Sequence, residues 1–247
     1  MTATIFAGPS LFGINHRKFA DLDFRPPAAC GDLLAAVRRG AATIGLIDGT
    51  FENTASVWHK EILAALDRGV RVFGAASMGA LRAAECHDFG MIGIGEVFAD
   101  YRDGRRTADA DVAVMHAPEA LEFRPLTEAL VDVDATVARM WNLGLLDDGE
   151  AIALGAAARR IHYKDRTWDA IVAAVNSAQE RQAEIYGTIR RHRASLKQAD
   201  ALALLNALAE EVRGATTSHG IRGEQLQRTL FLDALEARIR RDEGEAA

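Results

Sequence analysis

The chain of 247 residues is poor in cysteine and has no long apolar run. Cys30 and Cys86 are its only cysteines, so the sequence offers neither a disulfide framework nor enough thiolates for a cysteine-only structural zinc site. No stretch has the roughly 20 apolar residues that a transmembrane helix needs, and residues 1–9 lack the charged leader and apolar core of a signal peptide. We therefore expect reduced thiols, a cytoplasmic location and no membrane association.

Metal-binding and phosphate-binding motifs are also absent from the sequence. The seven histidines show no H-E-x-x-H or comparable ligand spacing, which argues against a metal centre. No glycine-rich phosphate loop is present, and a net charge of −6 argues against generic nucleic-acid binding. We therefore expect no metal, no cofactor and no nucleic-acid partner.

The first half of the chain alternates strand-like and helix-like segments. Apolar and β-branched residues predict strands over 2–7, 43–47, 70–73 and 111–115. Helical periodicity is predicted over 33–38, 56–66 and 80–85. Strands that alternate with helices are typical of a parallel sheet with right-handed crossovers.

The second half reads as mainly helical. Helices are predicted over 131–145, 149–161, 168–193, 200–212 and 224–241. The sequence thus predicts an α/β fold in which residues 1–126 form a parallel-sheet core that carries the site. Residues 127–247 form a mainly helical region that could serve as a partner-binding extension.

The segment 70–85 is the most informative one, because a strand turns through small residues onto Ser77 and then becomes a helix. A hydroxyl at this place lies at the positive end of a helix, beside backbone N–H groups that can hold an oxyanion. The pattern partly matches the nucleophile elbow G-x-S-x-G: Gly79 supplies the second glycine and Ala75 stands at the first. The alternative is that Ser77 only caps the helix.

A second candidate, Lys60, lies in the first turn of the helix predicted over 56–66. The helix macrodipole disfavours an additional positive charge there, which suits a lysine that acts as a base. The alternative is a solvated lysine paired with a nearby glutamate. His59, beside it, is expected to contact a partner protein or to position the site residues without touching the substrate.

Polar loops follow each of the predicted strands, so they should meet at one edge of the sheet. Asp48 follows the strand over 43–47, and Ser10 follows the first strand. Asp48 could orient Lys60 or cap its own loop. Ser10 is a further polar candidate for the site, ranked after the others.

These segments together resemble the TfuA-like proteins, a family that accompanies YcaO enzymes in making peptide thioamides. The resemblance is carried by residues 6–11, 25–28, 47–49, 57–62, 73–85, 96–98 and 123–126, in the expected order. It covers roughly the first half of the chain, and we match no functional residue beyond Leu126.

The resemblance implies a hydrolase-like site with a serine and lysine pair that releases sulfide from a thiocarboxylated ThiS-type sulfur carrier. The matching residues are Ser77 as nucleophile and Lys60 as base, with backbone N–H groups near Met78 and Gly79 as oxyanion donors. The sulfide would pass to a YcaO partner, which carries the ATP chemistry, and a precursor peptide is a further partner.

Two other functions stay open. The chain could be a non-catalytic adaptor that brings YcaO and its peptide substrate together, with Ser77 as a helix cap and Lys60 as an interface charge. It could also be an α/β protein that binds a small molecule or nucleotide, which the topology permits.

Overall fold

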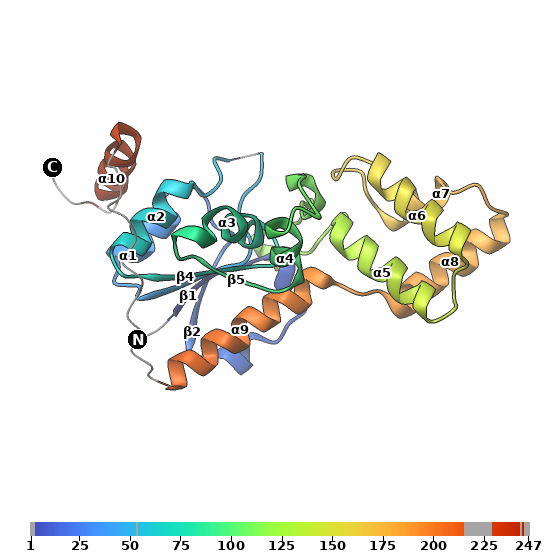
Figure 1. The fold of residues 1–247 in the computed structure, drawn as a ribbon, viewed down its shortest axis with the longest axis horizontal. Coiled ribbons are helices and arrows are strands. Elements are labelled where there is room, and N and C mark those ends of the chain that lie inside the picture. Colours follow the sequence, from blue (N-terminus) through green and yellow to red (C-terminus); the bar gives the residue numbers. More distant parts are fainter. Residues whose placement is uncertain (1–2, 53, 215–228, 243, 245–247) are drawn as a thin grey trace.

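The computed structural model describes residues 3–52, 54–214, 229–242 and 244. Its centre is a parallel sheet of five strands in the order β2-β1-β3-β4-β5 (Figure 1). The strands are β1 (Ala3–Phe6), β2 (Leu22–Arg25), β3 (Thr43–Leu46), β4 (Arg71–Ala75) and β5 (Ile92–Ile94). The predicted α/β class with a parallel sheet is therefore confirmed.

Helices cover both faces of the sheet. One face packs against α1 (Asp32–Arg38), α2 (His59–Asp67) and α3 (Met78–Cys86), and the other against α9 (Leu196–Gly214) (Figure 1). Alternate strand residues point to opposite faces, so Leu46 joins the first core while Ile5 and Phe73 join the second. Leu204 and Leu208 of α9 are fully buried there, and each contributes roughly 2 kcal/mol of hydrophobic stabilisation.

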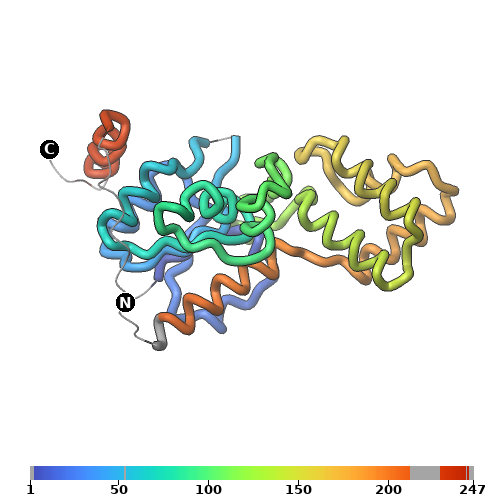
Figure 2. Tube along the Cα trace, viewed as in Figure 1, coloured from blue at the N-terminus to red at the C-terminus, as the bar shows by residue number. Residues whose placement is uncertain are grey.

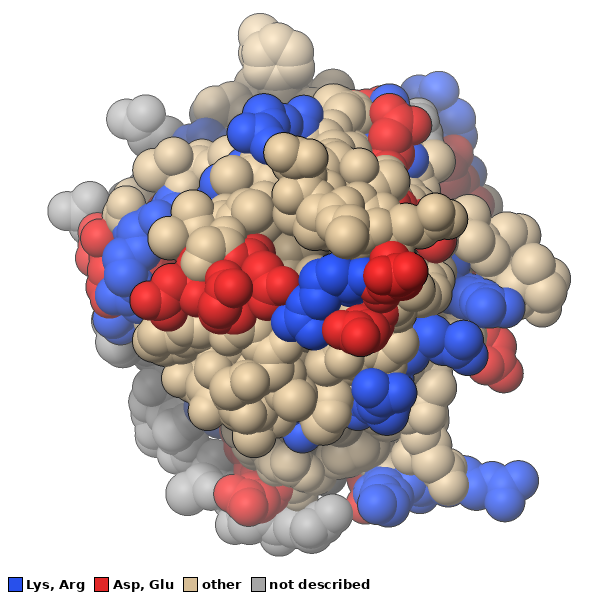
Figure 3. Space-filling view, turned by 90° about the vertical axis from the view of Figure 1, so that its right-hand side faces the viewer, with Lys and Arg blue, Asp and Glu red and all other residues tan. Residues whose placement is uncertain are grey.

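A helical lobe follows β5 and α4 (Glu96–Arg102). It consists of α5 (Leu130–Asn142), α6 (Asp148–Arg160), α7 (Trp168–Ala173) and α8 (Gln179–His192). Met140, Leu154 and Ile185 form part of a core that belongs to this lobe alone. Figure 2 shows the lobe extending to one side, and Figure 3 looks onto it: in the coloured part of this face, cationic and anionic side chains are interspersed.

The chain returns from the lobe to the sheet. α9 packs against β3, β4 and β5, and α10 (Leu230–Asp242) packs through Leu232 and Leu235 against Leu34 and Ala64 of α1 and α2. The mainly helical second half, confirmed by the structure, thus divides into a separate lobe and two helices that complete the α/β body.

Three of the predicted elements differ from the structure. The strand over 111–115 is wrong, because the backbone there bonds to side chains: Val112 accepts a hydrogen bond from Lys197 and Met115 donates one to Thr127. The single helix over 168–193 is two helices, α7 and α8, separated by residues 174–178. The helix over 224–241 is observed from Leu230, and residues 224–228 lie outside the described part of the chain.

Two strands and one helix of the first half were not predicted, namely β2, β5 and α4. β2 and β5 are the short edge strands of the sheet, and each has one neighbour instead of two. In the described residues, no helix has both the length and the apolar character needed to cross a bilayer.

Candidate functional site

The site begins where the strand order reverses, at the carboxyl ends of β1 and β3. In open α/β sheets the crevice outside such a switch point is the usual place for a ligand. Asp48, which follows β3 and is 2% exposed, accepts hydrogen bonds from the N–H groups of Gly8 and Ser10 at 2.9 and 3.0 Å and from the Ser10 hydroxyl at 2.7 Å. The structure therefore brings Asp48 and Ser10 together, and Asp48 fixes the turn after β1.

Ser77 lies at the same edge of the sheet, after β4, in a strained turn. Its N–H donates to the carbonyl of Ala75 at 2.8 Å, and Ala76 between them has a φ of +67°. A left-handed φ costs a residue with a Cβ roughly 1–2 kcal/mol, and strain of this kind is concentrated at functional sites. Ser77 occupies the N-cap position of α3, yet its side chain makes no capping hydrogen bond. Its hydroxyl is thus available to a ligand, unlike that of a serine that only caps a helix.

The two N–H groups predicted as oxyanion donors differ in availability. Gly79 donates its N–H to the carbonyl of Ile47 at 3.1 Å, and a Cβ at Gly79 would collide with the carbonyl oxygen of Leu46. Met78 is the first residue of α3, and its N–H has no hydrogen-bond partner in the described residues. Gly79 therefore seats the helix against β3, and Met78 has the free donor.

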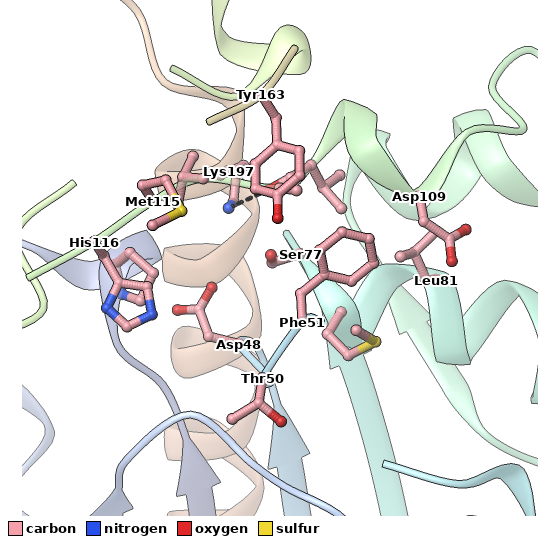
Figure 4. Close-up of a pocket in the computed structure, with 16 residues that line it drawn as sticks. Asp48, Thr50, Phe51, Ser77, Leu81, Asp109, Met115, His116, Tyr163 and Lys197 are labelled. Atoms are coloured by element: carbon pink, nitrogen blue, oxygen red, sulfur yellow. Dashed lines mark hydrogen bonds between the residues drawn. The ribbon is translucent and has the colours of Figure 1, made fainter. Parts of the chain in front are cut away.

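Ser77 lines a cavity of about 200 Å³ that receives residues from both parts of the molecule (Figure 4). Asp48 and Met78 come from the sheet edge, Tyr163 from the connection between α6 and α7, and Lys197 from α9. Figure 4 shows the Ser77 hydroxyl, the Lys197 amine and the Tyr163 hydroxyl all directed into this space. The cavity is therefore completed by the second half of the chain.

Lys197 is 3% exposed and lies in the first turn of α9. Its Nζ donates to the carbonyl of Val112 at 2.7 Å. Its backbone N–H donates to Asp132 Oδ1 at 3.0 Å, and Asp132 Oδ2 accepts from the Ser195 hydroxyl at 3.0 Å. Burial raises the pKa of the Asp132 carboxyl above its usual value. These bonds fix the start of α9, and with it the lysine, against α5.

Two other polar rings line the same cavity. Burial raises the pKa of the Tyr163 hydroxyl, which favours its protonated form as a hydrogen-bond donor. His116 Nδ1 lies 2.8 Å from the carbonyl of Ala117, which can only accept, so Nδ1 is the donor in this contact.

A second cavity, of about 380 Å³, adjoins the first and shares Pro9, Val114 and Lys197 with it. Ser10 and Glu128 also line it. Burial raises the pKa of the Glu128 carboxyl, which pairs with Arg193 at 2.6 Å. A polar cavity between the sheet body and the lobe thus lies beside the Ser77 cavity.

Lys60 and His59 lie in the first turn of α2, as predicted, but neither lines the Ser77 cavity. His59 Nε2 lies 2.7 Å from Glu85 Oε2, and Arg82 donates to the same oxygen at 2.7 Å. This half-exposed cluster joins α2 to α3. The structure therefore brings Ser77, Met78, Asp48 and Ser10 together and places the other two predicted residues outside that group.

The sequence reasoning missed Tyr163 and Lys197. Lys197 carries the same signal that selected Lys60, a lysine in the first turn of a helix, but the predicted helix began at residue 200 instead of Leu196. No local pattern marks Tyr163, because it lies in a connection whose position depends on the packing of the lobe. Among the described residues, no three His, Cys, Asp or Glu side chains gather in a way that could hold a metal ion.

The comparisons with known proteins give one family. The family model described as TfuA-like protein matches residues 48–167, and no curated protein matches the chain. The match includes Asp48, Lys60, Ser77 and Tyr163, whereas Lys197 lies beyond its end.

Proposed function

Because the chain belongs to the TfuA-like family over residues 48–167, we propose that it releases sulfide from a thiocarboxylated ThiS-type sulfur carrier and so supports YcaO-dependent peptide thioamidation. The observation that carries the proposal is Ser77: its hydroxyl caps nothing, follows a strained turn and faces a cavity that also holds a buried amine. Serine hydrolases need this combination of a hydroxyl that faces the substrate cavity and a nearby base.

In the proposed reaction, Ser77 Oγ attacks the carbonyl carbon of the carrier's C-terminal thiocarboxylate. The Met78 N–H, which is free in the described residues, stabilises the negative charge that develops on the carbonyl oxygen. The carbon–sulfur bond breaks, hydrosulfide leaves, and an ester joins the carrier to Ser77. Water then attacks this ester, which yields the carrier carboxylate and regenerates the serine.

The resemblance assigns the base to Lys60, and this assignment stays a prediction. Lys60 is half-buried in α2 and lies outside the set of residues that line the Ser77 cavity. A base must come within hydrogen-bond reach of the proton that it removes. Lys60 would therefore need a change in the α2 start to act on Ser77, and sulfide release by Lys60→Ala tests whether it does.

The test of the proposed function is sulfide release from a ThiS-type carrier protein prepared with a C-terminal thiocarboxylate. The full chain should release sulfide, Ser77→Ala should reduce the rate by roughly 1000-fold or more, and intact-mass analysis should find the carrier ester on wild-type protein alone. Ser56→Ala is the matched control, since Ser56 lies outside the cavity and bonds to Arg82. Unchanged release by Ser77→Ala would contradict the proposal.

One observation favours the adaptor function as the second candidate. Trp141, Leu143 and Ile152 of the lobe are 48%, 55% and 72% exposed, and exposed apolar groups near one another mark interaction surfaces. An adaptor would bind YcaO and the precursor peptide through such a surface without using Ser77. Thioamidation that is undiminished by Ser77→Ala but lost with Trp141→Glu would favour this function.

A further inference from the structure

We infer that the second cavity binds the C-terminal peptide segment of the sulfur carrier, and that Arg124 and Arg193 at its mouth recognise this segment. The inference rests on the proposed function and deepens it, because it names where the partner's chain lies when its end is beside Ser77. It concerns recognition and not chemistry, so the carrier segment binds here whether or not its thiocarboxylate is cleaved.

The first support is the way in which a carrier has to reach Ser77. Ser77 is 9% exposed, so the thiocarboxylate of a folded carrier can approach it only at the tip of an extended stretch of chain. Such a stretch covers roughly 3.3 Å per residue, and its last residues need a space next to the Ser77 cavity. The second cavity adjoins that cavity and shares Pro9, Val114 and Lys197 with it.

The second support is the order in which the lining residues of the second cavity become buried. Arg124 is exposed and the Arg193 side chain is 49% exposed, so these two residues lie at the solvent side. Thr127 and Lys197 line the same cavity and are buried. Lys197 also lines the Ser77 cavity. A chain that enters past the arginines and reaches Lys197 therefore ends beside the cavity that Ser77 lines.

The third support is the charge at the mouth. The Arg124 guanidinium has no hydrogen-bond or ion-pair partner among the described residues. Arg193 donates through Nη2 to Glu128 at 2.6 Å, and a guanidinium has five N–H donors, so others are available. A thiocarboxylate is an anion and peptide carbonyls are acceptors, and guanidinium groups bind both. Since the whole chain carries a net charge of −6, local cations are what attract an anionic chain end.

The fourth support is that the backbone holds Arg124 in place. Two backbone hydrogen bonds, of 2.8 and 2.9 Å, join residues 115–117 to residues 124–126. The first of these segments contributes to the lining of the Ser77 cavity and the other to that of the second cavity. The turn before Arg124 contains Glu122 and Phe123 with φ of +53° and +54°, a conformation that is uncommon for residues with a Cβ. Strain of this kind persists only where the surrounding structure fixes it.

The experiment measures, by titration calorimetry, how tightly the full chain binds a ThiS-type carrier that ends in an ordinary carboxylate. Arg124→Ala should raise the Kd by roughly 10-fold, because a charge-assisted hydrogen bond is lost, and Arg124→Glu by roughly 100-fold, because repulsion is added. Arg124→Lys should fall between the wild type and Arg124→Ala. Arg17→Glu, at an exposed position of η2 (His16–Phe19) outside both cavities, is the control and should keep the wild-type Kd.

A shortened carrier shows whether Arg124 acts on the C-terminal segment. Removing about four C-terminal residues, roughly 13 Å of extended chain, should weaken binding to the wild type by roughly 10-fold or more. The shortened carrier should bind wild type and Arg124→Ala with the same Kd, because the group that Arg124 contacts is gone. With the thiocarboxylated full-length carrier, Arg124→Ala should raise KM for sulfide release and keep kcat within about 2-fold.

The outcomes separate this inference from the proposed function. Equal binding of the full-length and shortened carriers, an unchanged Kd in Arg124→Glu, or absence of carrier binding by the wild type would overturn the inference. Binding of the precursor peptide that depends on Arg124, without such binding of the carrier, would assign the cavity to the peptide and overturn it too. Binding of the carrier as expected but without sulfide release would contradict the proposed function alone. Sulfide release with an unchanged KM in Arg124→Glu would contradict the inference alone.

Discussion

Asp48 shows how a single residue can organise the edge of the sheet. Its two carboxylate oxygens accept three hydrogen bonds from the turn after β1, so it joins the loops of β1 and β3 at the switch point. Of the two roles predicted for it, capping a loop and orienting Lys60, these bonds correspond to the first, although the loop is that of β1. The floor of the Ser77 cavity depends on this carboxylate.

Replacing Asp48 by asparagine should lower the free energy of unfolding by roughly 2 kcal/mol. The amide has the same shape, but its NH₂ group replaces one of the two accepting oxygens. In one orientation it would face the N–H groups of Gly8 and Ser10, which now donate to Oδ2, and in the other it would face the Ser10 hydroxyl, which now donates to Oδ1. Urea denaturation measures the change. Asp88→Asn, at a side chain that is 85% exposed, should stay within about 0.5 kcal/mol of the wild type. Equal stability of the two variants would contradict this account of Asp48.

At the scale of elements, Glu61 joins the starts of two helices. It is fully buried, and its carboxylate accepts the N–H of Trp58 at the start of α2 at 2.8 Å and the N–H of Gly31 at the start of α1 at 3.0 Å. Burial, together with the nearby charge of Asp32, outweighs these bonds and raises the pKa of Glu61 to about 7. The protonated carboxyl is therefore the form that the fold prefers below neutral pH.

This raised pKa predicts a fall in stability as the pH rises. Between pH 4.5, the usual pKa of a glutamate, and about 7, the unfolded chain loses the proton that the folded protein keeps, so the free energy of unfolding decreases, by up to about 3 kcal/mol. Above a pH of about 7, Glu61 has no further effect on the free energy of unfolding. Glu61→Gln should remove this part of the decrease in urea denaturation at pH 5 and 7.5.

The comparison between wild type and variant isolates Glu61, because burial also raises the pKa of Glu128, Asp132 and Asp200. Those groups make the free energy of unfolding decrease with rising pH in the wild type and in the variant alike. Glu180→Gln, at an exposed position of α8, should keep the wild-type slope. A Glu61→Gln protein that still shows the full decrease would refute the prediction.

Elements with strong local patterns could be predicted, and elements that depend on tertiary contacts could not. β3, β4 and the helices after them follow from apolar runs and helical periodicity, and these placed Ser77 and Asp48 at one edge of the sheet. The strand expected over 111–115 failed because its backbone bonds to Lys197 and Thr127, which are distant in sequence. Lys197 was missed because the predicted helix began at residue 200 instead of Leu196, and because the packing that brings α9 back to the sheet is not encoded near residue 197.

At the scale of the whole molecule, α9 connects the lobe to the sheet. Its first turn is bonded to α5 through Asp132, while Leu204, Leu205 and Leu208 are buried against the strands. The sheet body and the lobe have separate cores, so this helix and the cavity residues contributed by the lobe are what couple them. We therefore expect that a substitution at the lobe end of α9 changes the structure of the cavity that Ser77 lines.

Asp132→Ala tests this coupling. Loss of the carboxylate leaves the N–H of Lys197 and the hydroxyl of Ser195 without their acceptor, so the first turn of α9 should fray. Hydrogen exchange should lose protection there by roughly 10-fold, as expected for about 1.4 kcal/mol, while β3 and β4 keep theirs. The proposed sulfide release should fall with it, because Lys197 would no longer be held in the cavity.

The matched control is Asp134→Ala, on the same helix. Asp134 pairs instead with Arg106 and Arg159 at 2.6 and 3.0 Å, so its loss should change exchange around those arginines and leave α9 protected. If protection of the α9 start were equal in the two variants, the hydrogen bonds of Asp132 would not be what fixes that turn. If instead Asp132→Ala lost protection across the whole sheet, the lobe and the sheet would unfold as one unit. The main role of α9 would then be to stabilise both parts together, and the loss of sulfide release could not be assigned to Lys197.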